Sequence, residues 1–248
     1  MPNDDRGMTM LKMMTVGAAA LAMAAPAAAA PATVTVTGTV MGGFDPAGTF
    51  GTAGANLAGQ AFSAVFTINA KPDSATVTTG NSAFLFGNGA ASPVSAALTI
   101  GSATYNFAGS FSGLARAADA AGQGGTDLLY YMVEDTDVSL LPPGNTLFYV
   151  GFDTLRDVIG KGDYASNDVA GLTLADNAKG HVQIANRDAV TGSYGPSTFA
   201  DLAVTSIRAQ MAAPVPEPAT WAMMVTGFAM AGVALRRRRR VDARVRFA

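Results

Sequence analysis

The sequence contains no cysteine, and only 8% of its 248 residues are aromatic. Without a thiol the chain cannot form disulfides, thiolate zinc sites, iron–sulfur clusters or a cysteine nucleophile. Histidine is almost as scarce, because His181 is the only one and any Ser-His-Asp triad would need it. No Gly-x-Ser-x-Gly motif accompanies it, since Phe111 stands where the serine of segment 109–113 would be. The sequence therefore gives no support to a thiol or serine hydrolase.

Basic residues are scarce in the middle of the chain. Residues 31–211 contain seven Lys and Arg against fourteen Asp and Glu, a net charge of −7, whereas seven arginines lie in the last thirteen residues. Nucleic-acid binding draws its affinity from basic side chains that neutralise phosphates. The acidic middle of the chain therefore argues against nucleic acid as a partner, and the basic C-terminus needs a separate explanation.

An apolar segment lies near the N-terminus. Residues 8–32 carry a single charge, on Lys12, and continue as an alanine-rich run. A charged start, an apolar run and small residues at its end are the order found in a secretory signal peptide. The alternative, a buried alanine-rich helix, conflicts with the prolines inside the segment. We therefore expect residues 1–32 to be a signal peptide.

Three features follow one another at the C-terminus: a Pro-Glu-Pro turn, an uncharged apolar stretch and a block of arginines. In order they are Pro216, Glu217 and Pro218; residues 221–235, which begin with Trp221 and Ala222; and Arg236, Arg237, Arg238, Arg239 and Arg240. Prolines keep a segment extended and accessible to a protease. An aromatic residue marks the membrane–water interface, and the arginines hold their end of the segment in the cytoplasm.

The apolar stretch is short for a membrane anchor. As a helix its fifteen residues would span about 22 Å, against a hydrocarbon core of roughly 30 Å. We therefore expect a transmembrane helix that anchors the chain in the inner membrane only transiently.

The order of these features closely resembles the PEP-CTERM sorting domain, in the variant with Trp-Ala after the Pro-Glu-Pro. The resemblance implies that an exosortase-type membrane transpeptidase recognises the Pro-Glu-Pro turn, cleaves near it and removes the helix. It also implies a Gram-negative host whose surface carries exopolysaccharide. We assign residues 212–240 to this signal. Residues 241–248 depart from the usual pattern, which stops after the arginines, and we expect them in the cytoplasm. An ordinary C-terminal anchor is the alternative.

Residues 33–211, here called the body, alternate between apolar and polar side chains with a period of two. The expected strands are residues 33–37, 62–69, 75–79, 94–100, 104–111, 128–140, 146–153, 181–185 and 199–207. Clusters of glycine, proline, asparagine and aspartate separate them, as turns do. Strands of this number and spacing predict a mainly β protein, an antiparallel β-sandwich of jelly-roll type, with a barrel as the alternative.

Carboxylates are the only enriched functional side chains of the body. Asp135 and Asp137 share one face of the expected strand 128–140, and calcium takes six to eight oxygen ligands. They are the candidate calcium ligands, although no EF-hand pattern is present and a solvated acidic surface is the alternative. Paired carboxylates would also suit a glycan hydrolase. We assign no catalytic residue and no cofactor other than this candidate calcium.

These features together predict an exported protein of the cell surface or extracellular matrix. We expect a non-enzymatic structural or adhesive role in an envelope rich in exopolysaccharide. The alternative is a secreted calcium-dependent carbohydrate-binding module or a glycan hydrolase.

Overall fold

The computed structural model describes residues 31–107, 111–135, 146–186, 190–211, 224 and 226–232. The chain divides into two compact units: Ala29–Ala213, which contains the body, and a second unit formed by Met1–Ala28 and Pro214–Ala248. Every strand and every buried core residue that the structure describes lies within Ala29–Ala213. This unit therefore folds around a core of its own.

The expected signal helix and most of the expected membrane helix lie outside the described residues. Residue 224 and residues 226–232 are helical. Within the ranges that the structure describes, no helix combines the length and the hydropathy needed to cross a membrane.

The described part of the body contains thirteen strands and three short 3-10 helices. The strands are β1 (Ala32–Asp45), β2 (Ala55–Asn56), β3 (Ala61–Ile68), β4 (Ala75–Thr79), β5 (Ser82–Gly87), β6 (Val94–Ile100), β7 (Ala103–Phe107), β8 (Phe111–Ala118), β9 (Asp127–Asp135), β10 (Leu147–Thr154), β11 (Asp168–Ala170), β12 (Lys179–Ile184) and β13 (Thr198–Met211). The helices are η2 (Gly89–Ala91), η3 (Ala121–Gln123) and η4 (Leu174–Asp176).

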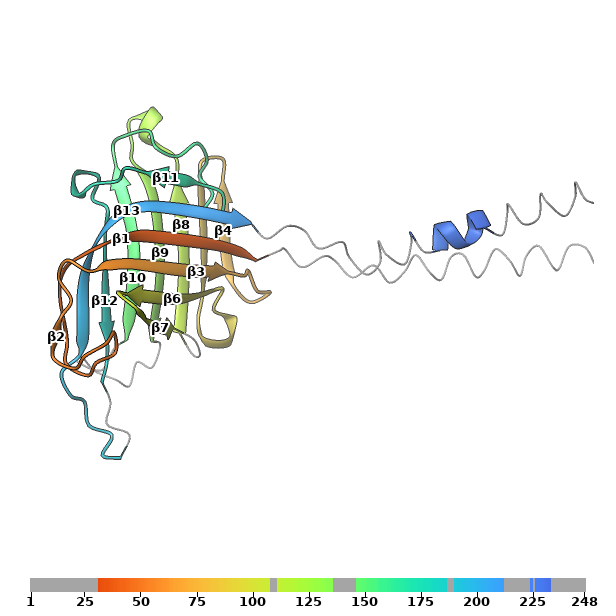
Figure 1. Ribbon diagram of the computed structural model, residues 1–248. Coiled ribbons are helices and arrows are strands. Elements are labelled where there is room, and N and C mark those ends of the chain that lie inside the picture. Colours follow the sequence, from red (N-terminus) through yellow and green to blue (C-terminus); the bar gives the residue numbers. More distant parts are fainter. Residues whose placement is uncertain are drawn as a thin grey trace, which may run out of the picture. The chain divides into compact units, whose positions relative to one another are not determined.

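All of these strands join one antiparallel sheet in the order β4-β5-β8-β9-β10-β12-β13-β1-β3-β6-β7, with β11 on β13 and β2 on β1 (Figure 1). The expectation of a mainly β, antiparallel body is confirmed. The expectation of two separate sheets in a jelly-roll sandwich is wrong, because the pairing is continuous. The fourteen-residue strands β1 and β13 pair along their length, and irregularities at Thr37/Gly38 and Val40/Gly42 interrupt the register. Such irregularities bend a strand and increase its twist, which curls the sheet without dividing it.

The curled sheet encloses one aromatic core. The ring of Phe66 on β3 lies 5.4 Å from that of Tyr131 on β9 and 5.1 Å from that of Phe148 on β10. The ring of Phe107 on β7 also stacks on that of Phe148, at 5.2 Å. All four side chains are completely buried. Strands far apart in the sheet order therefore meet through their inward-facing side chains.

The sequence pattern predicted some strands and missed others. On β3 the alternation is confirmed, because Phe62, Ala64, Phe66 and Ile68 are all buried. The expected strand 104–111 is instead the end of β7 and the start of β8. The pattern did not predict β5, and it predicted only the first residue of β8, Phe111. Their outer faces carry apolar side chains too, so neither strand shows clean alternation.

Candidate functional site: an aromatic belt on the outer face of the sheet

Large apolar side chains line up with polar ones in rows across the outer face of the sheet, because directly paired residues of neighbouring strands point to the same side. One row is Phe86, Leu114, Met132, Tyr149, His181 and Asp201, and the next contains Phe84, Arg116, Tyr130 and Gly151. A third joins Leu147, Gln183, Phe199 and Phe44. The outer belt, as we call it, comprises Phe44, Phe84, Phe86, Leu114, Tyr130, Met132, Leu147, Tyr149 and Phe199.

The outer belt exists because several central strands are apolar on both faces. On β9 the inward residues Leu129, Tyr131 and Val133 are buried, yet the outward Tyr130 and Met132 are also large and apolar and only half-buried. Strands of this composition are typical of sheets covered on both sides. A partly exposed surface that gathers large apolar side chains in this way commonly marks a binding site.

The rings of the outer belt are ordered against one another. The ring centroids of Tyr130 and Tyr149 are 5.8 Å apart with an angle of 25° between the planes, and the His181 ring lies 6.2 Å beyond Tyr149. Gly151, directly opposite Tyr130, provides the space for this arrangement. A Cβ atom at residue 151 would lie 3.1 Å from the Cδ2 atom of Tyr130 and 2.3 Å from the carbonyl oxygen of Leu129.

Polar groups border these rings. His181 Nδ1 lies 2.8 Å from the Oδ1 atom of Asp201 at the end of the row. The Tyr130 hydroxyl donates to the sulfur of Met132 at 3.7 Å. Burial raises the pKa of Tyr130 to about 12, with smaller contributions from Tyr149 and Glu134, so its phenol stays protonated at neutral pH. The outer belt thus combines apolar ring surface with groups that donate and accept hydrogen bonds.

The expected calcium ligands are only partly placed by the structure. Asp135 ends β9, where its backbone N–H donates to the Thr146 carbonyl at 2.8 Å, whereas Asp137 lies outside the described residues. The structure instead gathers Asp119, Asp127 and Asp157, whose nearest carboxylate oxygens all lie within 4.8 Å of one another. Sequence reasoning missed this cluster because Asp119 follows β8, Asp127 begins β9 and Asp157 follows β10, and these three places meet only in the fold.

Asp127 is already compensated by backbone donors. Its Oδ1 atom accepts the N–H groups of Ala120 and Ala121 at 3.1 and 2.9 Å, and Oδ2 accepts those of Val158 and Ile159 at 2.8 and 3.0 Å. The side chain is fully buried. Burial by itself raises the pKa of Asp127, but the four N–H groups outweigh it and hold the pKa below its usual 3.8. This carboxylate therefore fastens two loops together.

Asp176 has a similar role at η4. It accepts the backbone N–H of Thr173 at 2.9 Å, the hydroxyls of Thr154 and Thr173 at 3.0 Å each, and an N–H of Arg156 at 3.0 Å. Burial raises its pKa, but these donors reverse the effect and the pKa lies below 3.8. The open pocket of about 440 Å³ beside it therefore has a fully hydrogen-bonded carboxylate in its wall.

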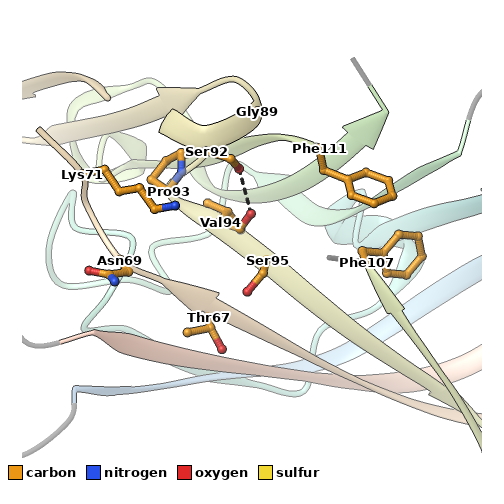
Figure 2. Close-up of a pocket in the computed structure, with 10 residues that line it drawn as sticks. All are labelled: Thr67, Asn69, Lys71, Gly89, Ser92, Pro93, Val94, Ser95, Phe107 and Phe111. Carbon is orange, nitrogen blue, oxygen red and sulfur yellow. Dashed lines mark hydrogen bonds between the residues drawn. The ribbon is translucent and has the colours of Figure 1, made fainter. Parts of the chain in front are cut away.

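A second pocket, of about 280 Å³, lies where β3 ends and β6 begins (Figure 2). Phe107 and Phe111 lie on the side opposite Lys71 and Asn69. The Lys71 ammonium donates to the Ala90 carbonyl at 3.0 Å, and the Ser92 hydroxyl donates to the Val94 carbonyl at 3.0 Å. No carboxylate or histidine is among the lining residues that the structure describes, so the described lining offers polar contacts through hydroxyl, amide and ammonium groups.

The C-terminal segment is where the chain matches a known family. The PEP-CTERM protein-sorting motif matches residues 214–239, which include the Pro-Glu-Pro turn, the apolar stretch and four of the five arginines. The chain therefore carries a PEP-CTERM sorting signal. Such a signal directs export and processing by an exosortase at the membrane. No curated protein and no solved structure matches the chain, so these comparisons identify the sorting signal alone.

Proposed function

We propose that the chain is a non-enzymatic protein of the cell surface or extracellular matrix, and that its body binds neutral polysaccharide through the outer belt. The observation that carries this proposal is the row of half-buried apolar and aromatic side chains that runs from Phe86 through Leu114 and Met132 to Tyr149 and ends at the His181 ring. The sorting signal supports it, because an exported protein meets the polymers of the envelope.

The chemistry of a sugar fits both components of the outer belt. A sugar ring exposes C–H groups on its faces and hydroxyls around its edge, and aromatic residues such as tyrosine combine an apolar surface with a polar tip. Tyr130 and Tyr149 offer ring surface, while the His181–Asp201 pair, joined through Nδ1 and Oδ1 at 2.8 Å, adds polar groups at the end of the row. Rings that are already half-buried lose little side-chain freedom when a ligand binds, which favours affinity.

The charge of the body favours a neutral polymer over an acidic one. Residues 31–211 carry a net charge of −7, and like charges oppose association. The basic side chains close to the outer belt rows are Arg116 and Lys179, which face Tyr130 and Gly151 across strand pairs. Two cations do not offset that excess, so a polymer rich in carboxylate or sulfate is disfavoured.

Two buried carboxylates, those of Asp127 and Asp176, already accept hydrogen bonds within the body, and this supports a non-enzymatic role. Glycan hydrolysis needs two carboxyl groups free to donate a proton and to act as base or nucleophile. Asp127 and Asp176 have lowered pKa values and accept four hydrogen bonds each. A carboxylate with a lowered pKa is a poor proton donor at neutral pH.

Affinity electrophoresis of the fragment 29–213 tests the proposal. The gels would contain either a neutral β-glucan or the acidic polymer alginate. We expect the neutral polymer to retard the wild-type fragment and Tyr149→Ala to weaken binding about tenfold, equivalent to about 1.4 kcal/mol. The matched control is Leu155→Ala, which shortens a side chain that is 78% exposed outside the outer belt. Equal retardation of the two variants, or retardation by alginate alone, would contradict the proposal.

A further inference from the structure

Strand β4 has a free edge. It ends the sheet order and pairs with β5 from Ala75↔Phe86 to Thr79↔Ser82 without a register shift. Among the strands that the structure describes, none pairs with its other side. All five of its residues are exposed, and Val77 is 58% exposed. The strand thus presents unpaired backbone groups to solvent while contributing nothing to the core.

The sequence of β4 lacks the features that normally protect an edge. Natural edge strands carry charged residues, prolines or bulges that prevent pairing with another chain. The five residues of β4, Ala-Thr-Val-Thr-Thr, contain no charge and no proline, and threonine and valine favour β structure. The opposite edge strand, β7, differs because Phe107 is buried and Tyr105 packs against it at 4.8 Å. Every side chain of β4, in contrast, is exposed, and no residue of the strand protects its free edge.

We propose that a second copy of this chain pairs with the body through β4, antiparallel and with Val77 opposite Val77. A two-fold axis at Val77 places Ala75 of one copy opposite Thr79 of the other, so the surface is complementary to itself, as a symmetric dimer requires. The absence of charge on β4 means that two acidic bodies meet where neither carries a like charge. This proposal does not depend on polysaccharide binding.

The pairing would join the outer belts of the two copies into one surface. Val77 is directly opposite Phe84 of the outer belt on β5, so it points to the same side of the sheet. In the dimer the two belts would lie on either side of the β4 pair in one extended sheet. Linked binding surfaces hold a polymer more tightly than either surface alone.

Sedimentation equilibrium of the fragment 29–213 tests the pairing by charge reversal. We expect the wild type to approach twice its monomer mass as its concentration rises, and Val77→Lys and Val77→Glu each to weaken dimerisation at least tenfold, because like charges directly opposite repel. An equimolar mixture of the two variants should restore the dimer as a heterodimer. Leu174→Lys is the control, because Leu174 is also 58% exposed but lies on η4.

Thermal unfolding would verify that both Val77 variants remain folded, as the exposure of this side chain predicts. A wild-type fragment that stays monomeric up to millimolar concentration would overturn the proposal. So would dimerisation of Val77→Lys equal to that of the wild type, an equal loss in Leu174→Lys, or a mixture that remains monomeric.

Discussion

At the scale of single residues, buried carboxylates stabilise the loops by accepting hydrogen bonds from their backbone N–H groups and hydroxyls. Asp45 accepts the backbone N–H groups of Thr49 and Phe50 at 2.8 and 2.7 Å and the hydroxyl of Thr198 at 2.8 Å. Asp127 and Asp176 do the same for other loops, with four donors each. A buried charge is tolerated only where hydrogen bonds compensate it. The acidic composition of the body therefore serves structure at these three positions.

We expect Asp127→Ala to lower the free energy of unfolding by about 3 kcal/mol, because it leaves four backbone N–H groups without their acceptor. Urea unfolding of the fragment 29–213 measures this. The control is Asp157→Ala, which removes an exposed carboxylate of the same cluster and should change stability by less than about 0.5 kcal/mol. A midpoint that rises with added calcium in the wild type but not in Asp157→Ala would instead identify a cation site.

Protonation of these carboxylates should lower the free energy of unfolding of the body at acid pH. The pKa values of Asp127 and Asp176 are lower in the folded body than the usual 3.8. Their stabilisation is therefore fully present above about pH 4 and is lost as the pH falls through the lowered values. Urea midpoints measured from pH 6 to pH 2 should fall below pH 4 in the wild type and more shallowly in Asp127→Ala. Parallel curves for the two proteins would contradict this assignment.

At the scale of elements, the central pair β1–β13 depends on a close approach of two backbones. A Cβ atom on Gly38 would lie 1.9 Å from the carbonyl oxygen of Ala203, beside the irregularity in β1. Neither strand can move away easily, because β1 also pairs with β3 and β13 also pairs with β12. A glycine is thus required where the sheet bends.

Gly38→Ala should destabilise the fragment 29–213 by about 2 kcal/mol or more, since the backbone must shift to accept the methyl group. Gly42→Ala is the matched control in the same strand, because nothing lies within 4 Å of its Cβ position. Thermal or urea unfolding compares the two variants. Equal losses of stability in the two variants would contradict the assignment of the effect to the contact with Ala203.

The strands could be predicted where one face of the strand is apolar and the other polar, as in β1 and β3. They could not be predicted in β5 and β8, where Phe84, Phe86 and Leu114 occupy the outer face above an apolar inner face. The single curled sheet was also beyond prediction, since the order of its strands is set by long-range pairing. The sorting signal was recognised because its chemistry is contiguous in the sequence. The outer belt draws on six strands, β1, β5, β8, β9, β10 and β13, so no local pattern reveals it.

At the scale of the whole molecule, the sorting signal is separable from the folded body. The sheet begins and ends with paired residues, Ala32 and Met211, and the matched motif starts at residue 214. The buried core that the structure describes ends at Ile207. Cleavage near Pro216 would therefore leave every strand of the sheet intact, as a signal that is removed after sorting requires.

The central claim is that the chain is exported and loses its sorting signal while the β body is retained. Intact-mass measurement of the protein recovered from outside the inner membrane tests it most directly. We expect a species that begins near Ala32, ends close to the Pro-Glu-Pro turn at 216–218, and lacks the apolar stretch and the arginines. Recovery of peptides that span residues 222–235 in that mature protein would contradict the claim.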